Sequence, residues 1–312
     1  MTDSNAVSDG IGTVAIVGSG TMGAQIGALI AVRGRNVRIH DASPEALDRA
    51  KTRIDKEILP AIIGPSSSLP ELQAARNRIT YAGLLQEAVT GVDLVIEAVK
   101  EDLDVKREVF ADLSRFAPNA ILATNSSSIP CARFADVVTN PERLLNMHFF
   151  APIWVRTMLE LMSSGSTTDD ILQRMKAFGD SLGLVTPIVH GQSKGFIINR
   201  IWRAVKRESL RVVDEGVASA EDVDRLWMLF FQTGYAPFGI MDMVGLDVVR
   251  DIEWSYQRET VDPTDKPSGT LLRMIEAGKL GEKSGQGFYS HPNPAYSQAS
   301  FLLGPTSASP DE

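Results

Sequence analysis

The sequence of 312 residues has little of several features that mark whole classes of protein. Its one cysteine, Cys131, excludes an intrachain disulfide, which favours a reducing compartment. It has no apolar run of about 18 residues, the length that a membrane-spanning helix needs. The first ten residues lack the basic and apolar segments of a signal peptide. We therefore expect a cytoplasmic protein without a membrane partner.

Basic residues are also fewer than acidic ones. Lysine and arginine number 31 against 39 acidic residues, which gives a formal net charge of -8. Because an acidic surface repels a phosphate backbone, we expect no nucleic-acid partner. The four histidines and single cysteine show no metal-ligand spacing, so we predict no metal. Hydrophobic residues make up 44% of the chain, enough for a packed core, and the length suits two domains.

The first 190 residues or so alternate between strand and helix patterns. The apolar run TVAIV (13–17) is typical of a strand buried on both faces of a parallel sheet. Further strands are predicted at NVRIHD, ITYAG, DLVIEAV and ILAT, and RLLNMHFF and TMLELM are predicted to pair. Between most of these runs lie segments whose apolar residues recur at helical spacing. The pattern predicts an α/β fold, a doubly wound Rossmann domain with a mostly parallel sheet.

Helical patterns replace this alternation near residue 193. From GFIINRIWRAVKRESLRVVDEG (195–216) onward, no convincing strand run follows. We predict an NAD-binding Rossmann domain over residues 1–192 and an all-helical C-terminal domain for substrate binding and dimerisation over 193–312. The tail from Pro292, rich in proline, serine and alanine, is expected to be loosely held. Four residues are candidates for a dimer interface, or equally for the core: Trp227, Met228, Phe230 and Phe231.

The motif GSGTMG directly follows the first predicted strand. Its first glycine permits a tight turn, its second allows a pyrophosphate to approach the backbone, and its third lets helix and strand pack closely. Asp41 follows Gly18 by 23 residues, where a carboxylate can bind both ribose hydroxyls and repel a 2′-phosphate. This pattern favours NAD over NADP; the alternative is a structural turn beside a solvated aspartate. The predicted cofactor residues are Gly18, Gly20, Thr21, Met22, Gly23 and Asp41.

Several other stretches become informative when they are taken together. NSSSI (125–129), NMHFFAP (146–152), MLELM (158–162) and GFIINR (195–200), with GSGTMG, GYAPFGIMDMVGLD and KLGEKSGQGFY, resemble the L-3-hydroxyacyl-CoA dehydrogenase family. The resemblance spans roughly residues 13–290 in the family's order. It implies NAD-dependent oxidation of an L-3-hydroxyacyl-CoA to the 3-ketoacyl-CoA, with direct hydride transfer, in a homodimer.

The resemblance also implies roles for single residues. His148 corresponds to the general base, and Glu160 to the carboxylate that orients it and stabilises its cation. Ser127 and Asn199 correspond to groups that hold the substrate oxygens, and Glu101, Lys106 and Lys283 are added to the NAD site. Taken alone, a histidine beside two phenylalanines is more often part of a core. Glu160 between two leucines needs a partner if it points inward.

The sequence departs from the family pattern at three places, one of which is Lys194, where the family commonly has a proline. Ala151 stands where the family has an asparagine that contacts the nicotinamide ribose, so one cofactor bond is expected to be lost. The segment ILPAIIGPSSSLPE (58–71) lacks the lysine cluster that helps the family bind coenzyme A. Two alternatives therefore stay open: a dehydrogenase of a free or carrier-bound anionic 3-hydroxy acid, and a non-catalytic NAD-binding protein.

Cations occur elsewhere instead. Asn199, Arg203 and Lys206 are spaced i, i+4 and i+7, so they share one face of a helix. We hypothesise that Arg203 and Lys206 bind a carboxylate of the substrate. The alternative is a charged helix face whose cations pair with Glu208 or Asp214.

Overall fold

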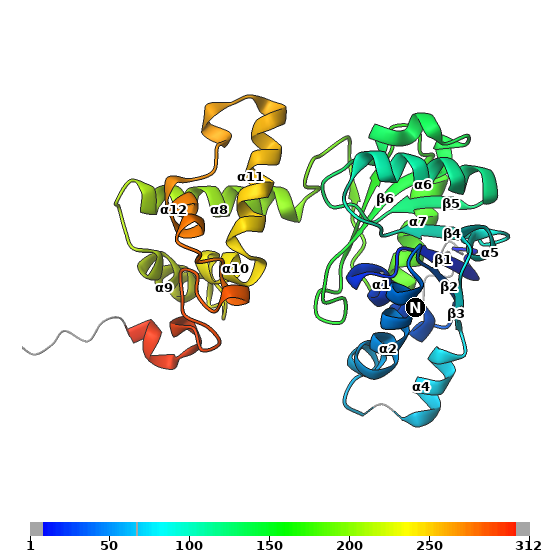
Figure 1. Cartoon of the computed structure of the whole chain (residues 1–312), viewed down its shortest axis with the longest axis horizontal. Helices are drawn as coiled ribbons and strands as arrows, with labels where there is room; N and C mark the ends of the chain where they lie inside the picture. The colour runs from blue at the N-terminus through cyan, green and yellow to red at the C-terminus, as the bar shows by residue number, and fades with distance from the viewer. Residues whose placement is uncertain (1–8, 67, 304–312) are drawn as a thin grey trace, which may run out of the picture. The chain divides into compact units, whose positions relative to one another are not determined.

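The computed structural model describes residues 9–66 and 68–303. The chain forms two compact units, with the division between Ile197 and Ile198. We call the part before this division the sheet unit and the part after it the helical unit (Figure 1). No helix in the described ranges is long and apolar enough to cross a membrane.

A single sheet organises the sheet unit. The described residues contribute eight strands in the order β3-β2-β1-β4-β5-β6-β7-β8. They are β1 (Thr13–Val17), β2 (Asn36–His40), β3 (Ile79–Ala82), β4 (Leu94–Glu97), β5 (Ile121–Thr124), β6 (Leu144–Phe149), β7 (Leu159–Ser163) and β8 (Ile188–Val189). Neighbours from β3 to β6 are parallel, β7 runs antiparallel to β6, and β8 is parallel to β7. The predicted mostly parallel sheet and the late strand pair are confirmed.

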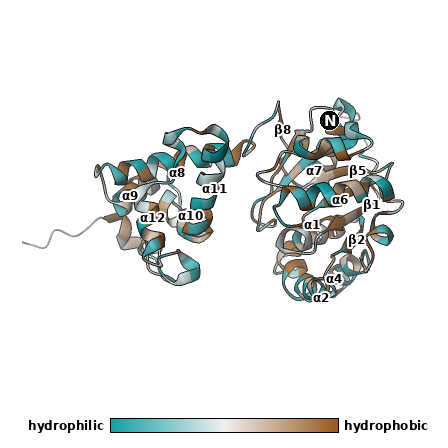
Figure 2. Cartoon of the chain, turned by 45° about the horizontal axis from the view of Figure 1, so that its top comes forward, coloured by the Kyte–Doolittle hydropathy of each residue, from teal (hydrophilic) through white to brown (hydrophobic). Residues whose placement is uncertain are grey.

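Helices cover both faces of this sheet. They are α1 (Thr21–Val32), α2 (Pro44–Arg53), η1 (Ile54–Ile58), α3 (Leu59–Ile63), α4 (Leu69–Arg76), α5 (Leu85–Val89), α6 (Leu103–Phe116), η2 (Cys131–Val137), η3 (Pro141–Arg143) and α7 (Asp169–Ser181). Val14 and Ile16 of β1 join an apolar cluster with residues of α1 and α7. Ala15 and Val17 join a second cluster with α6 and η2. Because successive side chains point to opposite faces, β1 is buried on both sides, which explains its uninterrupted apolar run (Figure 2).

The strand order reverses beside β1. β2 lies on one side of β1 and β4 on the other, so the loops after β1 and β4 leave the sheet at a topological switch point. In open parallel sheets, ligands bind outside the carboxyl ends of the strands at such a point. The carboxyl edge of β1, β2, β4, β5 and β6 is therefore where the site is to be sought.

The helical unit has its own core. Its elements are α8 (Ile198–Asp214), α9 (Ala220–Phe231), α10 (Pro237–Val244), α11 (Leu246–Thr260), η4 (Pro263–Asp265), α12 (Gly269–Glu276), η5 (Glu282–Ser284), η6 (Ala295–Ser297) and η7 (Ala299–Leu303). Apolar side chains from these helices form one cluster. Phe301 is 7% exposed and belongs to it, so the expectation of a loosely held tail was wrong as far as Phe301. Residues 304–312 of that tail lie outside the described residues.

Two buried acids tie the late motifs of the sequence together. Asp224 accepts hydrogen bonds from the backbone N–H groups of Phe238 and Gly239 and from the Tyr289 hydroxyl. Burial raises the pKa of Asp224 to about 6 in spite of these bonds. Asp242 accepts the backbone N–H of Tyr289 and contacts the His291 ring at 3.1 Å. GYAPFGIMDMVGLD and GQGFY therefore hold the helical unit together.

Candidate active site

The glycine loop has the shape that a pyrophosphate site needs. Gly18 has a φ of +101°, a conformation that favours glycine. A Cβ at Gly23 would lie 1.8 Å from the carbonyl oxygen of Gly18, so helix and loop can pack only through a glycine. A Cβ at Gly20 would meet nothing within 4 Å. The loop is thus closed on its protein side and open beside the first turn of α1, whose N–H groups belong to Thr21, Met22 and Gly23.

Asp41 lies directly after β2 and is bonded to the glycine loop. Its Oδ2 accepts the backbone N–H of Ser19 at 2.8 Å and the Ser19 hydroxyl at 2.9 Å, and its Oδ1 accepts the Ser43 N–H at 3.0 Å. Burial alone would raise the pKa of Asp41, but these hydrogen bonds hold it below its usual value. The carboxylate is therefore ionised at neutral pH and placed beside the predicted pyrophosphate site.

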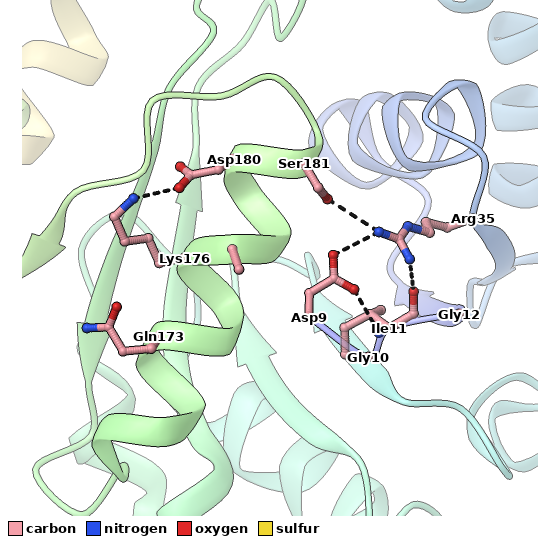
Figure 3. A pocket seen from close by; sticks show the side chains of 10 residues that line it. Asp9, Gly10, Ile11, Gly12, Arg35, Gln173, Lys176, Asp180 and Ser181 are labelled. Atoms are coloured by element: carbon pink, nitrogen blue, oxygen red, sulfur yellow. Dashed lines mark hydrogen bonds and ion pairs between the residues drawn. The ribbon is translucent and has the colours of Figure 1, made fainter. Parts of the chain in front are cut away.

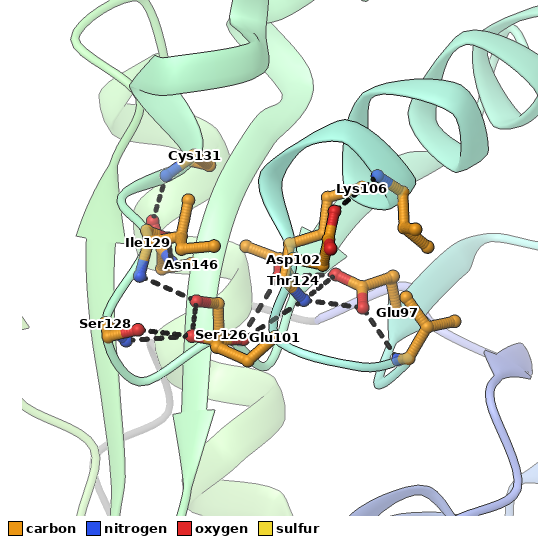
Figure 4. A network of polar contacts seen from close by, with 12 residues as sticks. Glu97, Glu101, Asp102, Lys106, Thr124, Ser126, Ser128, Ile129, Cys131 and Asn146 are labelled. Atoms are coloured by element: carbon orange, nitrogen blue, oxygen red, sulfur yellow. Dashed lines mark hydrogen bonds and ion pairs between the residues drawn. The ribbon is translucent and has the colours of Figure 1, made fainter. Parts of the chain in front are cut away.

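A buried ion pair lies at the carboxyl end of β4 (Figure 4). Lys106 of α6 donates to both oxygens of Glu97 at 2.8 and 2.9 Å, and the two side chains are 1% and 0% exposed. Glu97 also accepts the backbone N–H of Val99 and the Thr124 hydroxyl. A buried carboxylate with this many donors is compensated, so the pair fixes the ends of β4, β5 and α6 against one another.

Glu101 extends this network to the loop after β5. It lies 3.3 Å from the Lys106 ammonium and accepts bonds from the hydroxyls of Ser126 and Ser128 and from the Ser128 N–H. Burial would raise the pKa of Glu101, but Lys106 and these bonds lower it overall. Ser127 is exposed between two serines that are held in place. Predicted site residues from three segments therefore gather at one edge of the sheet.

His148 and Glu160 form the second part of the site. They are opposite each other in the antiparallel register of β6 and β7. His148 Nδ1 lies 3.0 Å from Glu160 Oε2, and the two residues are only 5% and 3% exposed. Glu160 Oε1 accepts the backbone N–H of Ile197 at 3.0 Å. With Nδ1 directed at the carboxylate, Nε2 is the ring nitrogen that can receive a substrate proton.

Aromatic rings and backbone bonds enclose the histidine. The ring centroids of Phe150 and Phe196 lie 4.2 and 4.9 Å from that of the imidazole. Asn125, after β5, accepts the Phe149 N–H at 3.0 Å, which ties the serine loop to the end of β6. Ala151 follows in the next loop, and its backbone oxygen accepts a hydrogen bond from the Arg156 guanidinium. Its side chain offers no amide to a cofactor.

The remaining predicted residues belong to the helical unit. Asn199 is the second residue of α8 and is half-buried. Lys283, in η5, forms an ion pair with Asp247 of α11.

Arg203 and Lys206 have partners inside the helical unit. Arg203 bonds Glu253 at 3.0 Å and Asp265 at 2.8 Å. Lys206 is 2% exposed, with its ammonium 3.6 Å from Glu253 Oε1. Burial lowers the pKa of Lys206, although Glu253 opposes this. These contacts favour the alternative of a charged helix face. The expected partners, Glu208 and Asp214 of the same helix, were wrong, because the acids that bind these cations come from α11 and η4.

A cavity of about 770 Å³ lies at the opposite, amino edge of the sheet (Figure 3). Its charged lining is internally paired: Arg35 bonds Asp9 and the Ile11 carbonyl, and Lys176 bonds Asp180. It lies away from the carboxyl ends where such sheets bind ligands. Among the described residues, no three histidine, cysteine or acidic side chains gather in a way that could hold a metal ion.

Sequence reasoning missed three residues of the site. Glu97 could have been found, because an acid that ends a fully apolar strand needs a partner. Phe196 and Ile197 could not, because their contacts depend on a backbone turn that bulky residues rarely adopt: the φ of Phe196 is +54°.

Both parts of the chain are similar to known proteins. Residues 13–193 match the family model of the 3-hydroxyacyl-CoA dehydrogenase NAD-binding domain, and residues 195–291 match that of the 3-hydroxyacyl-CoA dehydrogenase C-terminal domain. A 3-hydroxybutyryl-CoA dehydrogenase of Mycobacterium tuberculosis is 33% identical over 287 residues, which cover 91% of this chain and 100% of the relative.

Two further relatives bear on structure and substrate. The crystal structure of (S)-3-hydroxybutyryl-CoA dehydrogenase from Ralstonia eutropha has a TM-score of 0.84 at 31% identity, covering 91% of this chain and 100% of that one. A 5-formyl-3-hydroxy-2-methylpyridine 4-carboxylate 5-dehydrogenase of Mesorhizobium japonicum is 29% identical in a match that covers 90% of this chain and 91% of the relative.

Proposed function

The chain belongs to the 3-hydroxyacyl-CoA dehydrogenase family, and from this premise we propose how its residues carry out the reaction. The protein is an NAD-dependent oxidoreductase that oxidises a 3-hydroxyacyl-CoA to the 3-ketoacyl-CoA. The observation that carries the proposal is the buried His148–Glu160 pair, in the same sheet unit as the glycine loop and Asp41.

We assign the cofactor to the carboxyl edge of the sheet. The N–H groups that begin α1 would hold the pyrophosphate, and Asp41 the adenosine ribose. Glu101 would face the nicotinamide half, with Lys106 holding it there through the ion pair at 3.3 Å. Lys283 would contribute from the helical unit. Bound NAD supplies the acceptor for the hydride that leaves the substrate carbon.

The protein's part in the chemistry is to hold the substrate and take its proton. Ser127 and Asn199 would bind the substrate oxygens. His148 Nε2 would receive the proton of the 3-hydroxyl as the carbonyl forms. Glu160 keeps Nδ1 as the proton-bearing nitrogen and stabilises the imidazolium, and its burial strengthens that interaction.

The test is turnover of (S)-3-hydroxybutyryl-CoA, followed by NADH absorbance. His148→Ala should lower kcat roughly 100-fold or more, the usual scale for losing a general base, while the Kd for NAD stays within about twofold. His190→Ala is the matched control, because His190 is an exposed histidine just after β8. Equal turnover of the His148→Ala variant and the wild type would remove His148 from the mechanism.

A second candidate is oxidation of a free or carrier-bound anionic hydroxy acid. It is favoured by the segment 58–71, which contains no lysine or arginine, and by the relative named for a pyridine carboxylate substrate. Turnover of free 3-hydroxybutyrate but not of its coenzyme A thioester would support it. Binding of NAD without turnover of any hydroxyacyl compound would instead favour a non-catalytic role.

We also propose a homodimer formed through α9. Leu226, Leu229 and Phe230 are spaced i, i+3 and i+4 and are 66, 50 and 79% exposed, so they form one apolar face of that helix. Phe231 is exposed beside them, whereas Met228 packs in the core. Phe230→Glu should convert the dimer to a monomer in light scattering after gel filtration, and an unchanged mass would reject this interface.

A cytoplasmic location is the last part of the proposal. It rests on the single cysteine, Cys131, which has no second cysteine with which to form an intrachain disulfide and which is buried. Cell fractionation with an antibody tests it, and recovery of the protein from a non-cytoplasmic fraction would reject it.

A further inference from the structure

The segment between β8 and α8, residues 191–197, packs against β7 and forms hydrogen bonds with it. Gln192 donates to the Ser163 carbonyl at 2.8 Å, and the Ser193 N–H lies 3.3 Å from the Met162 sulfur. Phe196 joins a small apolar cluster with Met162 and Val189. The last residues of the sheet unit therefore lie against the strand that carries Glu160.

Two residues of this segment touch the catalytic pair. The Ile197 N–H donates to Glu160 Oε1 at 3.0 Å, while Oε2 faces His148. The Phe196 ring lies 4.9 Å from the imidazole, centroid to centroid, with 33° between their planes. Phe150 contacts the same imidazole at 4.2 Å, so two phenylalanines confine it.

The backbone of Phe196 is held in an unusual conformation to make these contacts. Its φ is +54°, which bulky residues rarely adopt without support from their surroundings. Ser193 gives that support: its carbonyl accepts the Phe196 N–H at 3.0 Å, and its hydroxyl donates to the Phe196 carbonyl at 2.9 Å. The turn brings the ring and the next N–H group to the same pair.

We propose that Phe196 and Ile197 are positioning residues for the His148–Glu160 pair. A carboxylate rotates easily about its last bond, and an N–H on one oxygen fixes the plane in which the other oxygen faces the imidazole. The Phe196 ring restricts the imidazole so that Nε2 keeps one direction. Because a reacting group misplaced by about 1 Å can lose 100-fold in rate, such restraint belongs to catalysis. The inference rests on the proposed role of His148 as base.

Phe196→Ala is the first test. It should lower kcat about tenfold, while the KM for (S)-3-hydroxybutyryl-CoA and the Kd for NAD stay within about twofold, because only the orientation of the base is lost. Val189→Ala is the matched control: it truncates another member of the same cluster, whose strand partner is Met162 and not Glu160. This control should keep kcat within about twofold.

A double-mutant cycle separates positioning from general packing. In the Glu160→Ala background, Phe196→Ala should change kcat by less than about twofold, because the orientation that it protects is already lost. A tenfold loss in both backgrounds, or no loss in either, would overturn the proposal. If Phe196→Ala does not fold, Phe196→Leu keeps most of the apolar volume without the flat ring and completes the same cycle. The proposed function fails separately, if His148→Ala itself retains full activity.

Discussion

Asp41→Asn tests the cofactor site most sharply, because both oxygens of that carboxylate accept backbone N–H groups. Ser19 donates to Oδ2 at 2.8 Å and Ser43 to Oδ1 at 3.0 Å. An amide keeps one acceptor but turns its NH₂ toward the other N–H. It also removes the charge that strengthens bonds from the ribose hydroxyls, an effect of about 1.5–3 kcal/mol. We therefore expect the Kd for NAD to rise by about tenfold or more, since about 1.4 kcal/mol is a factor of ten.

Discrimination between the two cofactors should fall with it. Loss of the charge removes the repulsion of a 2′-phosphate, so the ratio of kcat/KM for NAD to that for NADP should drop at least about tenfold. The hydrogen bonds to Asp41 hold its pKa in the folded protein below its usual value, so its charge is present at neutral pH and is lost only as the pH falls through that lowered pKa. The measurement is kcat/KM for each cofactor at pH 7, with the variant Asp48→Asn, at an exposed aspartate, as the control. A wild-type preference for NADP, or an unchanged ratio in the variant, would refute the reasoning.

Three further substitutions probe the rest of the molecule. Lys106→Met leaves Glu97 buried without its cation and should lower the free energy of unfolding by about 3–5 kcal/mol in denaturant melts, part of which Glu97→Gln restores. Gly23→Ala places a Cβ 1.8 Å from the Gly18 carbonyl oxygen and should abolish NAD binding in fluorescence titrations. Arg203→Leu should also cost about 3–5 kcal/mol of stability, with KM nearly unchanged. A tenfold rise in KM for an anionic hydroxy acid, with no loss of stability, would instead support a role for Arg203 in binding the substrate.

Local patterns were sufficient to predict most of the sheet unit. The apolar run of β1 is buried on both faces, as such runs are in parallel sheets. The His148–Glu160 pair needed one further condition, which is the register of β6 and β7. A slip of one residue would have turned one side chain to the other face of the sheet. The apolar residues of both strands agree with that register, but the pairing itself was implied by the family resemblance and not by the alternation.

Tertiary partners could not be predicted in the same way. Helical spacing correctly placed Arg203 and Lys206 on one face of α8, but it says nothing about what lies opposite that face. Glu253 and Asp265 lie 50 and 62 residues after Arg203 and are brought there by packing. The ends of a chain pose the same difficulty, since Phe301 reads as part of a polar tail until its place in the core is known.

The acids at the carboxyl edge share one arrangement that explains why this edge can be precise. Asp41, Glu97, Glu101 and Glu160 each accept at least one backbone N–H from a loop beside them, in addition to their other polar partners. Each acid therefore fixes a loop as well as a charge, and each loop in turn fixes the direction of its acid. Replacing such an acid by its amide sets a donor against a donor, so the change reaches the backbone as well as the charge. A site built in this way takes the orientation of its acids from backbone N–H groups of the neighbouring loops.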